Sequence, residues 1–154
     1  MHRLYETDEI TVFWDSDKCF HAKKCVTGCP EVFDITKKPW INIDNAPTKK
    51  VWQTVSACPS GALTVTYNHD VRIEFDGDSK CSRAIFGGRQ VGECDYDVTD
   101  DGWVIYHTEV DEEFGGKGIA RRLVYAVVEQ AEKQHVKVAA TCSYARKVLE
   151  RQPN

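Results

Sequence analysis

The chain lacks the features that define several large classes of protein. No apolar run approaches the roughly 20 residues of a membrane-spanning helix, and residues 1–6 lack the hydrophobic stretch of a secretory signal. The basic residues are scattered in doublets and the net charge at pH 7 is -4, so a cationic surface for nucleic acid is missing. We therefore expect a cytoplasmic protein with neither a membrane nor a nucleic-acid partner.

What the chain does have is cysteine, with seven in 154 residues. In a reducing compartment these are not expected to form a disulfide framework, and their spacing is more typical of metal ligation with a few free thiols. A chain of this length forms one ordinary domain or two small ones, and a metal centre stabilises a small domain that buries little surface.

Four cysteines in the first half have the spacing of iron–sulfur ligands. Cys19, Cys25 and Cys29 form a local run, Cys58 lies further along the chain, and the last two are each followed by proline. The irons of a cluster need soft, anionic thiolate ligands, and a cysteine followed by proline is typical of ferredoxin runs. The pattern predicts a metal cluster held by these four residues.

The ligand set is left open by one gap in the run. Ala22 occupies the position of the second cysteine in the bacterial ferredoxin pattern, in which the cysteine before proline serves a second cluster. Cys29 is then either a displaced fourth ligand or not a ligand. In the second case we expect a 3Fe-4S cluster, or a 4Fe-4S cluster with a non-cysteine ligand such as His21.

A structural zinc site is the alternative, because four cysteines would also suffice for zinc. Zinc modules favour two close pairs of cysteines, whereas the spacings here are wider. Cys81 and Cys94 lie outside the run, and we interpret them as packing residues.

Several segments of residues 10–67 carry a family resemblance: Cys19-Phe20-His21-Ala22, Cys25, Pro30-Glu31-Val32-Phe33, Pro39-Trp40-Ile41 and Cys58-Pro59-Ser60-Gly61-Ala62-Leu63. Through them, residues 10–67 resemble the divergent single-cluster 4Fe-4S ferredoxin-like family. The resemblance implies a ferredoxin-like domain that binds one iron–sulfur cluster and that has a redox partner protein.

The expected fold class is α+β. In the first half, β-type runs at 10–14 and 62–67 are natural partners, and a one-face helix from Thr48 leads to Cys58. In the second half we expect an antiparallel meander with strands at 82–86, 91–98 and 103–110, followed by a glycine loop and an amphipathic helix from Ile119. A strand at 136–141 and a short helix at 145–151 complete this half. Polar breaks at 68–70 and 76–79 predict two domains, 1–68 and 69–154.

The glycine loop precedes the clearest helix of the chain. Its glycines allow close approach, and the helix N-terminus supplies partial positive charge for phosphates. It has neither the spacing of a P-loop nor that of the dinucleotide fingerprint. The residues that we assign to a nucleotide-containing cofactor are Val110, Gly115, Gly116, Lys117, Gly118, Ile119 and Ala120.

Four further segments belong to the part of the chain from about residue 82 to the C-terminus: His107-Thr108-Glu109-Val110, Gly116-Lys117-Gly118-Ile119-Ala120, Leu123-Val124 and Ala140-Thr141-Cys142-Ser143-Tyr144-Ala145. Through them, this part resembles the small GNAT-type N-acetyltransferases. The resemblance implies that the amides of residues 116–120 hold the pyrophosphate of acetyl-CoA, and that an amine is the acceptor. Gly115 departs from the Arg or Gln that is common in the superfamily, which removes a side chain but leaves the amides.

Four residues of this half are catalytic candidates. His107 and Glu109 are two apart on a strand and are candidate bases, Cys142 lies where a helix start stabilises a thiolate, and Tyr144 is a candidate acid. Each of the first three also has a purely structural interpretation, as a hydrogen-bonding or packing residue.

The sequence thus predicts an iron–sulfur module joined to an acetyl-CoA-binding module that transfers an acetyl group to an amine, with the cluster tuning the second site. The alternative is a ferredoxin-like electron carrier or redox sensor whose second half binds CoA or a partner without catalysis.

Overall fold

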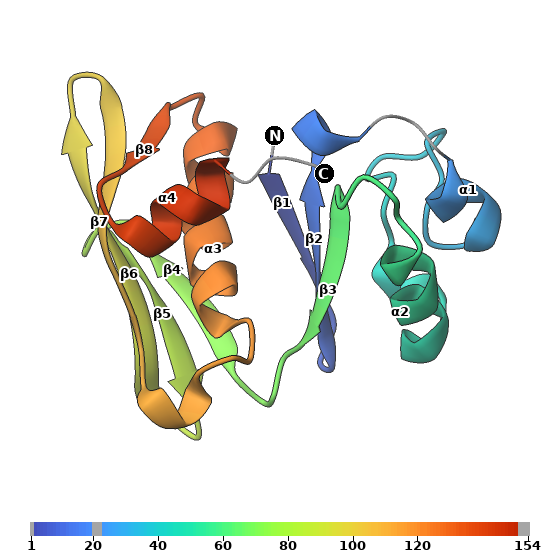
Figure 1. Ribbon diagram of the computed structural model, residues 1–154, viewed down its shortest axis with the longest axis horizontal. Coiled ribbons are helices and arrows are strands. Elements are labelled where there is room, and N and C mark those ends of the chain that lie inside the picture. The colour runs from blue at the N-terminus through green and yellow to red at the C-terminus, as the bar shows by residue number, and fades with distance from the viewer. Residues whose placement is uncertain (1, 20–22, 151–154) are drawn as a thin grey trace.

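The computed structural model describes residues 2–19 and 23–150, which form two β-sheets with a long helix between them (Figure 1). The strand order is β1-β2-β3 in the first sheet and β4-β5-β6-β7-β8 in the second. Every pairing is antiparallel except that of β7 with β8, which is parallel. This is the expected α+β class.

The first sheet is made of β1 (His2–Glu6), β2 (Ile10–Asp15) and β3 (Leu63–Tyr67). The residues between β2 and β3 contain the four predicted ligand cysteines and form four short elements: η1 (Ser16–Lys18), α1 (Lys24–Gly28), η2 (Ile43–Asn45) and α2 (Thr48–Ser56). Val51 and Val55 on one face of α2 pack with Ile10, Val12 and buried residues of the cysteine loop. This packing brings the end of α2, and with it Cys58, back to the sheet.

The second sheet is made of β4 (Arg72–Asp76), β5 (Cys81–Phe86), β6 (Arg89–Thr99), β7 (Gly102–Val110) and β8 (Val138–Ala140). Two helices and a 3-10 turn complete this half: η3 (Glu112–Phe114), α3 (Ile119–Lys133) and α4 (Ser143–Glu150). The meander and the helix at Ile119 are confirmed. β8 is shorter than the expected strand, and α4 begins two residues before the expected start.

Helix α3 contacts both sheets. Leu123 and Val127 belong to the apolar core that α3 forms with the five-stranded sheet. The opposite side of α3 faces the first half of the chain, where the ring of Tyr125 lies 4.9 Å from that of Phe13. The helix is therefore the common layer between the two halves (Figure 1).

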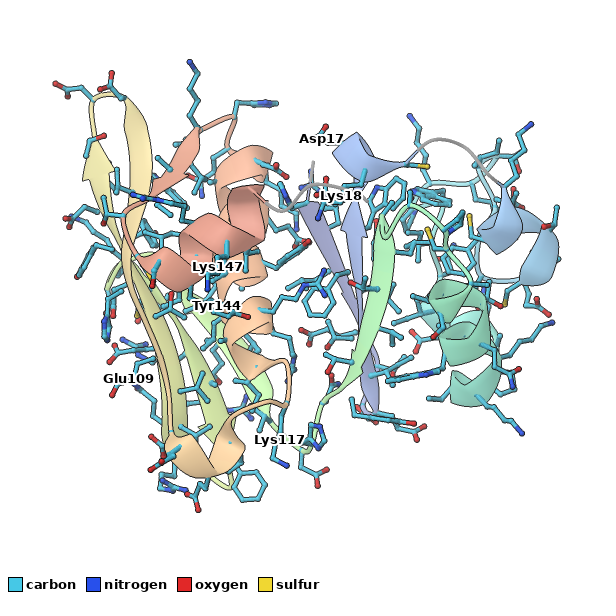
Figure 2. All side chains as sticks on the ribbon, in the orientation of Figure 1. Asp17, Lys18, Glu109, Lys117, Tyr144 and Lys147 are labelled. Carbon is cyan, nitrogen blue, oxygen red and sulfur yellow. The ribbon has the colours of Figure 1, made fainter. Side chains whose placement is uncertain are left out.

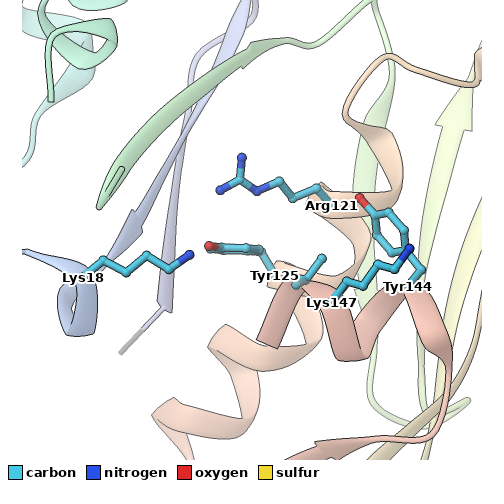
Figure 3. Close-up of a pocket in the computed structure, with 6 residues that line it drawn as sticks. Lys18, Arg121, Tyr125, Tyr144 and Lys147 are labelled. Atoms are coloured by element: carbon cyan, nitrogen blue, oxygen red, sulfur yellow. The ribbon is translucent and has the colours of Figure 1, made fainter. Parts of the chain in front are cut away.

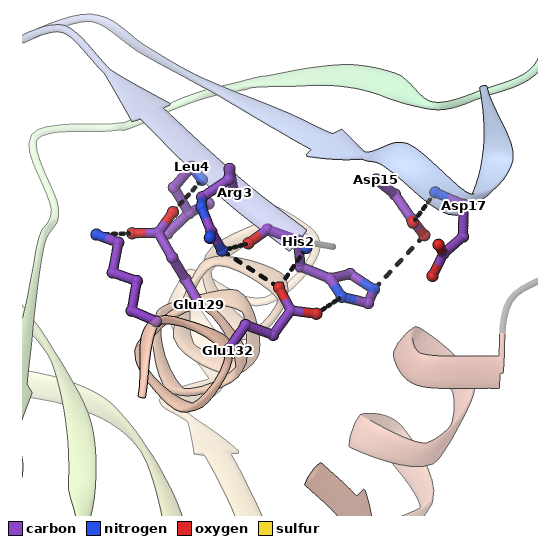
Figure 4. Close-up of polar contacts among 8 residues, drawn as sticks. His2, Arg3, Leu4, Asp15, Asp17, Glu129 and Glu132 are labelled. Atoms are coloured by element: carbon purple, nitrogen blue, oxygen red, sulfur yellow. Dashed lines mark hydrogen bonds and ion pairs between the residues drawn. The ribbon is translucent and has the colours of Figure 1, made fainter. Parts of the chain in front are cut away.

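Polar contacts fix α3 against β1 (Figure 4). Glu129 accepts a hydrogen bond from the backbone N–H of Leu4 at 2.6 Å. Glu132 binds the imidazole of His2 at 3.0 Å and the guanidinium of Arg3 at 3.2 Å. These contacts fix β1, which pairs along its length with β2, against a helix about 130 positions away along the chain. The sequence pattern did not predict this strand.

A buried arginine binds the segment between the sheets. Arg122 is 1% exposed and donates to the carbonyl oxygen of Val71 at 2.9 Å and to that of Asn68 at 3.4 Å. The last strand of the first sheet ends at Tyr67, and the first strand of the second sheet begins at Arg72. The division at residues 68 and 69 stays a prediction. None of the helices within the described ranges has the length and apolar character to cross a membrane.

Candidate functional site

Three of the predicted ligand cysteines come together at one end of the first sheet. Cys19 directly follows η1, Cys25 lies in α1, and Cys58 lies two residues after the end of α2. Burial raises the pKa of the Cys25 thiol, and the nearby Cys58 and Cys19 raise it further. Each of the two neighbours is thus close enough to Cys25 to act on its charge.

The surroundings of Cys58 favour a thiolate. Burial alone would raise its pKa, but the hydroxyl of Ser60, 3.5 Å from the sulfur, and the backbone N–H groups of Ser60, Ala62 and Leu63 outweigh burial and lower the pKa. The tight turn after the cysteine aims these donors at the sulfur. An anionic sulfur is the form that binds iron.

Cys29 points to a different neighbourhood. It is fully buried in the core of the first half, and burial raises the pKa of its thiol. The charged side chains that act most on it are Glu31, to which it is hydrogen-bonded, and Lys50, which pairs with Glu31 at 2.7 Å. The other candidate ligand, His21, lies outside the described residues.

The donor set fits an iron–sulfur cluster. Cys19 and Cys25 open onto a cavity of about 690 Å³, and soft thiolates are the ligands that clusters take. Trp14 and Trp40, with ring centres 5.0 Å apart, give this cavity apolar walls. Four cations complement the negative charge of a thiolate-bound cluster: Arg3, Lys23, Lys37 and Lys38.

The second candidate site lies where β7 and β8 separate. The two strands pair only from Trp103 to Ile105, and the backbone N–H groups of Thr141 and Cys142 then both donate to the carbonyl oxygen of Ile105. A β-bulge at Tyr106 interrupts the register with β6 at the same point. In the described chain no strand pairs with the β8 side of β7 beyond Ile105, so an edge of β7 is left open.

Cys142 lies at this separation, at the start of α4. Its sulfur is 3.5 Å from the hydroxyl oxygen of Thr108, which in turn lies 3.7 Å from the sulfur of Cys94. Burial by itself raises the pKa of Cys142, but hydrogen bonds from the backbone N–H of Ala145 and from Thr108 outweigh it and lower the pKa. Burial instead raises the pKa of Cys94 to about 12. Cys142 is thus the more readily ionised of these two thiols.

His107 and Glu109 alternate with Thr108 along β7, so they point to the other face of the sheet. They lie 3.3 Å apart and are exposed. Across the pairing with β6 they face Asp95 and Glu93, and ligand atoms of His107 and these two carboxylates lie within 4.8 Å of one another. The structure therefore brings the candidate bases together in an acidic patch and places Cys142 behind them.

The glycine loop ends at the start of α3. Gly116 and Gly118 have φ angles of +73° and +76°, which favour glycine, and Gly118 caps α3 without a side-chain hydrogen bond to the helix. The first amides of a helix have no partner within the helix, so they remain for a ligand. The hydroxyl of Thr66, on β3, donates to the carbonyl oxygen of Lys117 at 3.2 Å. The first half thus supports the loop directly.

Tyr144 lies on the first turn of α4, and its ring lines a separate cavity between α4 and α3 (Figure 3). Figure 2 shows it on the α3 side of α4, apart from Glu109 on the sheet and Lys117 at the loop. The catalytic candidates therefore occupy three different surfaces around the β7–β8 separation.

Two contacts at these sites were not anticipated from the sequence, those of Thr108 and Thr66. Strand alternation does signal Thr108, because it shares the inner face of the sheet with Cys94, its partner on β6. Thr66 carries no such signal, because its contact joins residues 51 positions apart.

Comparison with known proteins finds a different family in each half of the chain. Residues 5–68 match the family described as divergent 4Fe-4S mono-cluster, and residues 83–154 match the GCN5-related N-acetyl-transferase family. The chain belongs to both families, one in each half. It joins an iron–sulfur cluster-binding domain to an N-acetyltransferase-like domain.

Particular relatives cover one half each. YjdI of Escherichia coli K12 is 35% identical over 68 residues, 44% of this chain and 87% of its own length. Ferredoxin-2 of Streptomyces griseolus is 38% identical over 58 residues, 34% of this chain and 91% of its own. A GCN5-like protein of Staphylococcus aureus, solved by NMR, is 30% identical, with a TM-score of 0.43, over 53% of this chain and 80% of that one.

Proposed function

We propose that the protein is an acetyl-CoA-dependent N-acetyltransferase whose activity responds to the state of its iron–sulfur cluster. The observation that carries the transferase proposal is the separation of β7 from β8 beside Cys142, with the glycine loop at the other end of the same strand.

The cofactor would bind along the open edge of β7. Backbone amides of residues 116–120 would hold its pyrophosphate at the start of α3. The unpaired edge beyond Ile105 offers N–H and C=O groups for the two amides of the pantetheine arm, as a sheet edge does for an added strand. Val110 ends that strand, and Gly115 begins the loop. This placement would bring the thioester to the separation, next to Cys142.

The chemistry needs a neutral amine, a polarised carbonyl and a proton for the leaving sulfur. The acidic patch of Glu93 and Asp95 would attract a cationic amine, and His107, assisted by Glu109, would accept its proton. The amine nitrogen would then bond to the carbonyl carbon as the carbon–sulfur bond breaks. The sulfur would leave as a thiolate and take a proton from Tyr144, and the second proton that the nitrogen loses on becoming an amide would restore the Tyr144 hydroxyl. The N–H donors around Cys142 lie at a position that can stabilise negative charge.

The cluster would be held by Cys19, Cys25 and Cys58, as 3Fe-4S or as 4Fe-4S with a ligand other than Cys29. The bound cluster supplies one-electron redox chemistry. A physical route to the second half exists, because β3 begins five residues after Cys58 and its Thr66 contacts the glycine loop. This contact supports tuning of the acetyl-CoA site by the cluster.

The test is acetyl-CoA-dependent thiol release over a panel of amines, with the cluster oxidised and then reduced. We expect release with at least one amine, a rate that differs between the two states, and a large loss in Cys142→Ser and Tyr144→Phe. Cys81→Ser and Tyr67→Phe remove the same groups elsewhere and should retain activity. An equal rate in both redox states would remove the tuning but leave the transferase.

The second candidate is an electron carrier or redox sensor with a non-catalytic second half. It is favoured by the exposed mouth of the cluster cavity, where Ile35 is 75% exposed beside Lys37 and Lys38, a surface suited to an acidic redox partner. Thermal stabilisation by acetyl-CoA without thiol release from any amine would support this candidate and contradict the transferase.

A further inference from the structure

The four residues that join the two halves, 68–71, form a turn with an uncommon backbone conformation, which we call the joint. The backbone N–H of Val71 donates to the carbonyl oxygen of Asn68 at 2.9 Å. The two central residues are both left-handed, with φ of +52° at His69 and +60° at Asp70, and neither is glycine. A backbone of this kind persists where the surrounding structure holds it in place.

Each end of the joint is fixed in its own half. Asn68 is buried, and its backbone N–H donates to the carbonyl oxygen of Glu9 at 2.8 Å. Its side-chain amide donates to the carbonyl oxygen of Thr7 at 2.8 Å and accepts a hydrogen bond from the hydroxyl of Thr11 at 2.6 Å. Val71 is buried in the apolar core of the second half. The joint therefore connects the two sheets without a free length of chain.

Arg122 ties the joint to the start of α3. Its buried guanidinium donates to both carbonyl oxygens of the joint, that of Val71 at 2.9 Å and that of Asn68 at 3.4 Å. Its backbone N–H donates to the carbonyl oxygen of Gly118 at 3.1 Å, and this bond closes the first turn of the helix. One residue thus fixes the first turn of α3 relative to the joint.

The charge of Arg122 is only weakly compensated. Among the described residues its one ion-pair partner is Glu6, 3.9 Å away, and its Nε has no hydrogen-bond partner. Desolvating a guanidinium is costly, and replacing buried ionic groups by apolar ones is often neutral for stability. What the planar fork of an arginine adds at this place is geometry, because it holds two carbonyl oxygens at once.

We propose that Arg122 is a positioning residue for the cofactor. By fixing the first turn of α3 to the joint, it sets the direction of the amides that would hold the pyrophosphate of acetyl-CoA. The identity of this ligand rests on the proposed function, whereas the positioning of the helix start does not. Together with the bond from Thr66 to Lys117, Arg122 gives the iron–sulfur half two separate contacts that shape the glycine loop.

The test uses the whole, cluster-loaded protein and three variants. Arg122→Met removes both the fork and the charge, and Arg122→Lys keeps the charge without the fork. Asp70→Pro leaves Arg122 intact but breaks the joint, because proline fixes φ at about −65°. Two controls are matched to these changes. Arg72→Met removes an exposed arginine beside the joint, and Asp70→Gly, at an exposed position, keeps the left-handed backbone.

The first measurement is the affinity for CoA, by calorimetry in buffer without urea, where tryptophan fluorescence shows each variant to be folded. We expect CoA to bind about tenfold more weakly to Arg122→Met, Arg122→Lys and Asp70→Pro, and as in the wild type to both controls. The double variant Arg122→Met/Asp70→Pro should be no weaker than either single variant, because both changes break one connection.

The second measurement is native-state hydrogen exchange, which separates positioning from general stability. Amides of residues 122–124 should exchange at least about tenfold faster in Arg122→Met, while those of residues 127–131, later in α3, keep their wild-type rates. If Arg122→Met does not fold, Arg122→Lys and Asp70→Pro carry the same comparison.

Three results would overturn the proposal: wild-type CoA affinity in Arg122→Met, full recovery of affinity in Arg122→Lys, which would assign the effect to charge, or equally accelerated exchange in both segments of α3. Failure of CoA to bind to the wild type would contradict the proposed function, and the exchange comparison alone would then decide whether Arg122 positions the helix start.

Discussion

Replacing Gly118 with alanine tests the contact between the glycine loop and the iron–sulfur half. Gly118 has φ +76°, and a Cβ there would lie 2.6 Å from the hydroxyl oxygen of Thr66 and 3.1 Å from its methyl carbon. Gly116 has nearly the same φ, +73°, but a Cβ there would meet nothing within 4 Å. The two glycines therefore differ in their surroundings and not in their backbone conformation.

The expected destabilisation follows from these distances. The left-handed conformation costs a residue with a Cβ about 1–2 kcal/mol, and that is the whole effect expected for Gly116→Ala. Overpacking adds about 1–3 kcal/mol, so Gly118→Ala should lower the free energy of unfolding by about 2–5 kcal/mol. A Thr66→Ala background removes the hydroxyl at 2.6 Å and the methyl carbon at 3.1 Å and leaves only the Cβ at 3.1 Å, so Gly118→Ala should approach the value for Gly116→Ala.

The assay is urea unfolding of the anaerobically purified protein, followed by tryptophan fluorescence, for the four members of this double-mutant cycle and for Gly116→Ala. Equal destabilisation by Gly116→Ala and Gly118→Ala, unchanged by Thr66→Ala, would show that the loop does not rest on β3. The proposed route from the cluster to the acetyl-CoA site would then lose its physical basis.

Two further predictions concern ionisation. Burial lowers the pKa of His2, but its contacts with Asp15 and Glu132 outweigh burial and raise the pKa. The stability that protonated His2 contributes is therefore complete below pH 6.5 and is lost as pH rises through the raised pKa. In urea titrations across this range, the difference in unfolding free energy between the wild type and His2→Gln should shrink as pH increases, and a constant difference would refute the contact. Iodoacetamide should alkylate Cys142 at lower pH than Cys94. Thr108→Val removes one hydrogen bond to the Cys142 sulfur and should shift the pH–rate profile of Cys142 alkylation to higher pH, whereas Thr108→Ser should not. An unmoved profile in Thr108→Val, measured by peptide mass spectrometry, would contradict the assigned contact.

Much of the local structure was predictable because local patterns determine it. The apolar stripe from Ile119 to Ala131 predicted α3, and the β-type runs at 10–14 and 62–67 predicted β2 and β3. The strands that were missed, β1 and β4, have mainly half-buried or exposed residues, so neither shows the alternation of a strand with one buried face.

The sites were predictable only in part, for a different reason. Cysteine spacing identified the residues that converge, but not that Cys29 faces Glu31 instead. The spacing of His107 and Glu109 correctly placed them side by side, whereas their separation from Cys142 depends on the direction of side chains around the bulge at Tyr106. The cavity beside Tyr144 joins three elements, η1, α3 and α4, that only the packing of α3 between two sheets brings together.

The most direct test of the central claim is metal analysis of the anaerobically purified protein, with iron, acid-labile sulfide and zinc quantified per chain. We predict iron and sulfide without zinc in the wild type, their loss in Cys58→Ala, and their retention in Cys29→Ala and in Cys81→Ala, the control for a buried thiol elsewhere. Zinc in place of iron, or full iron and sulfide in Cys58→Ala, would contradict the account.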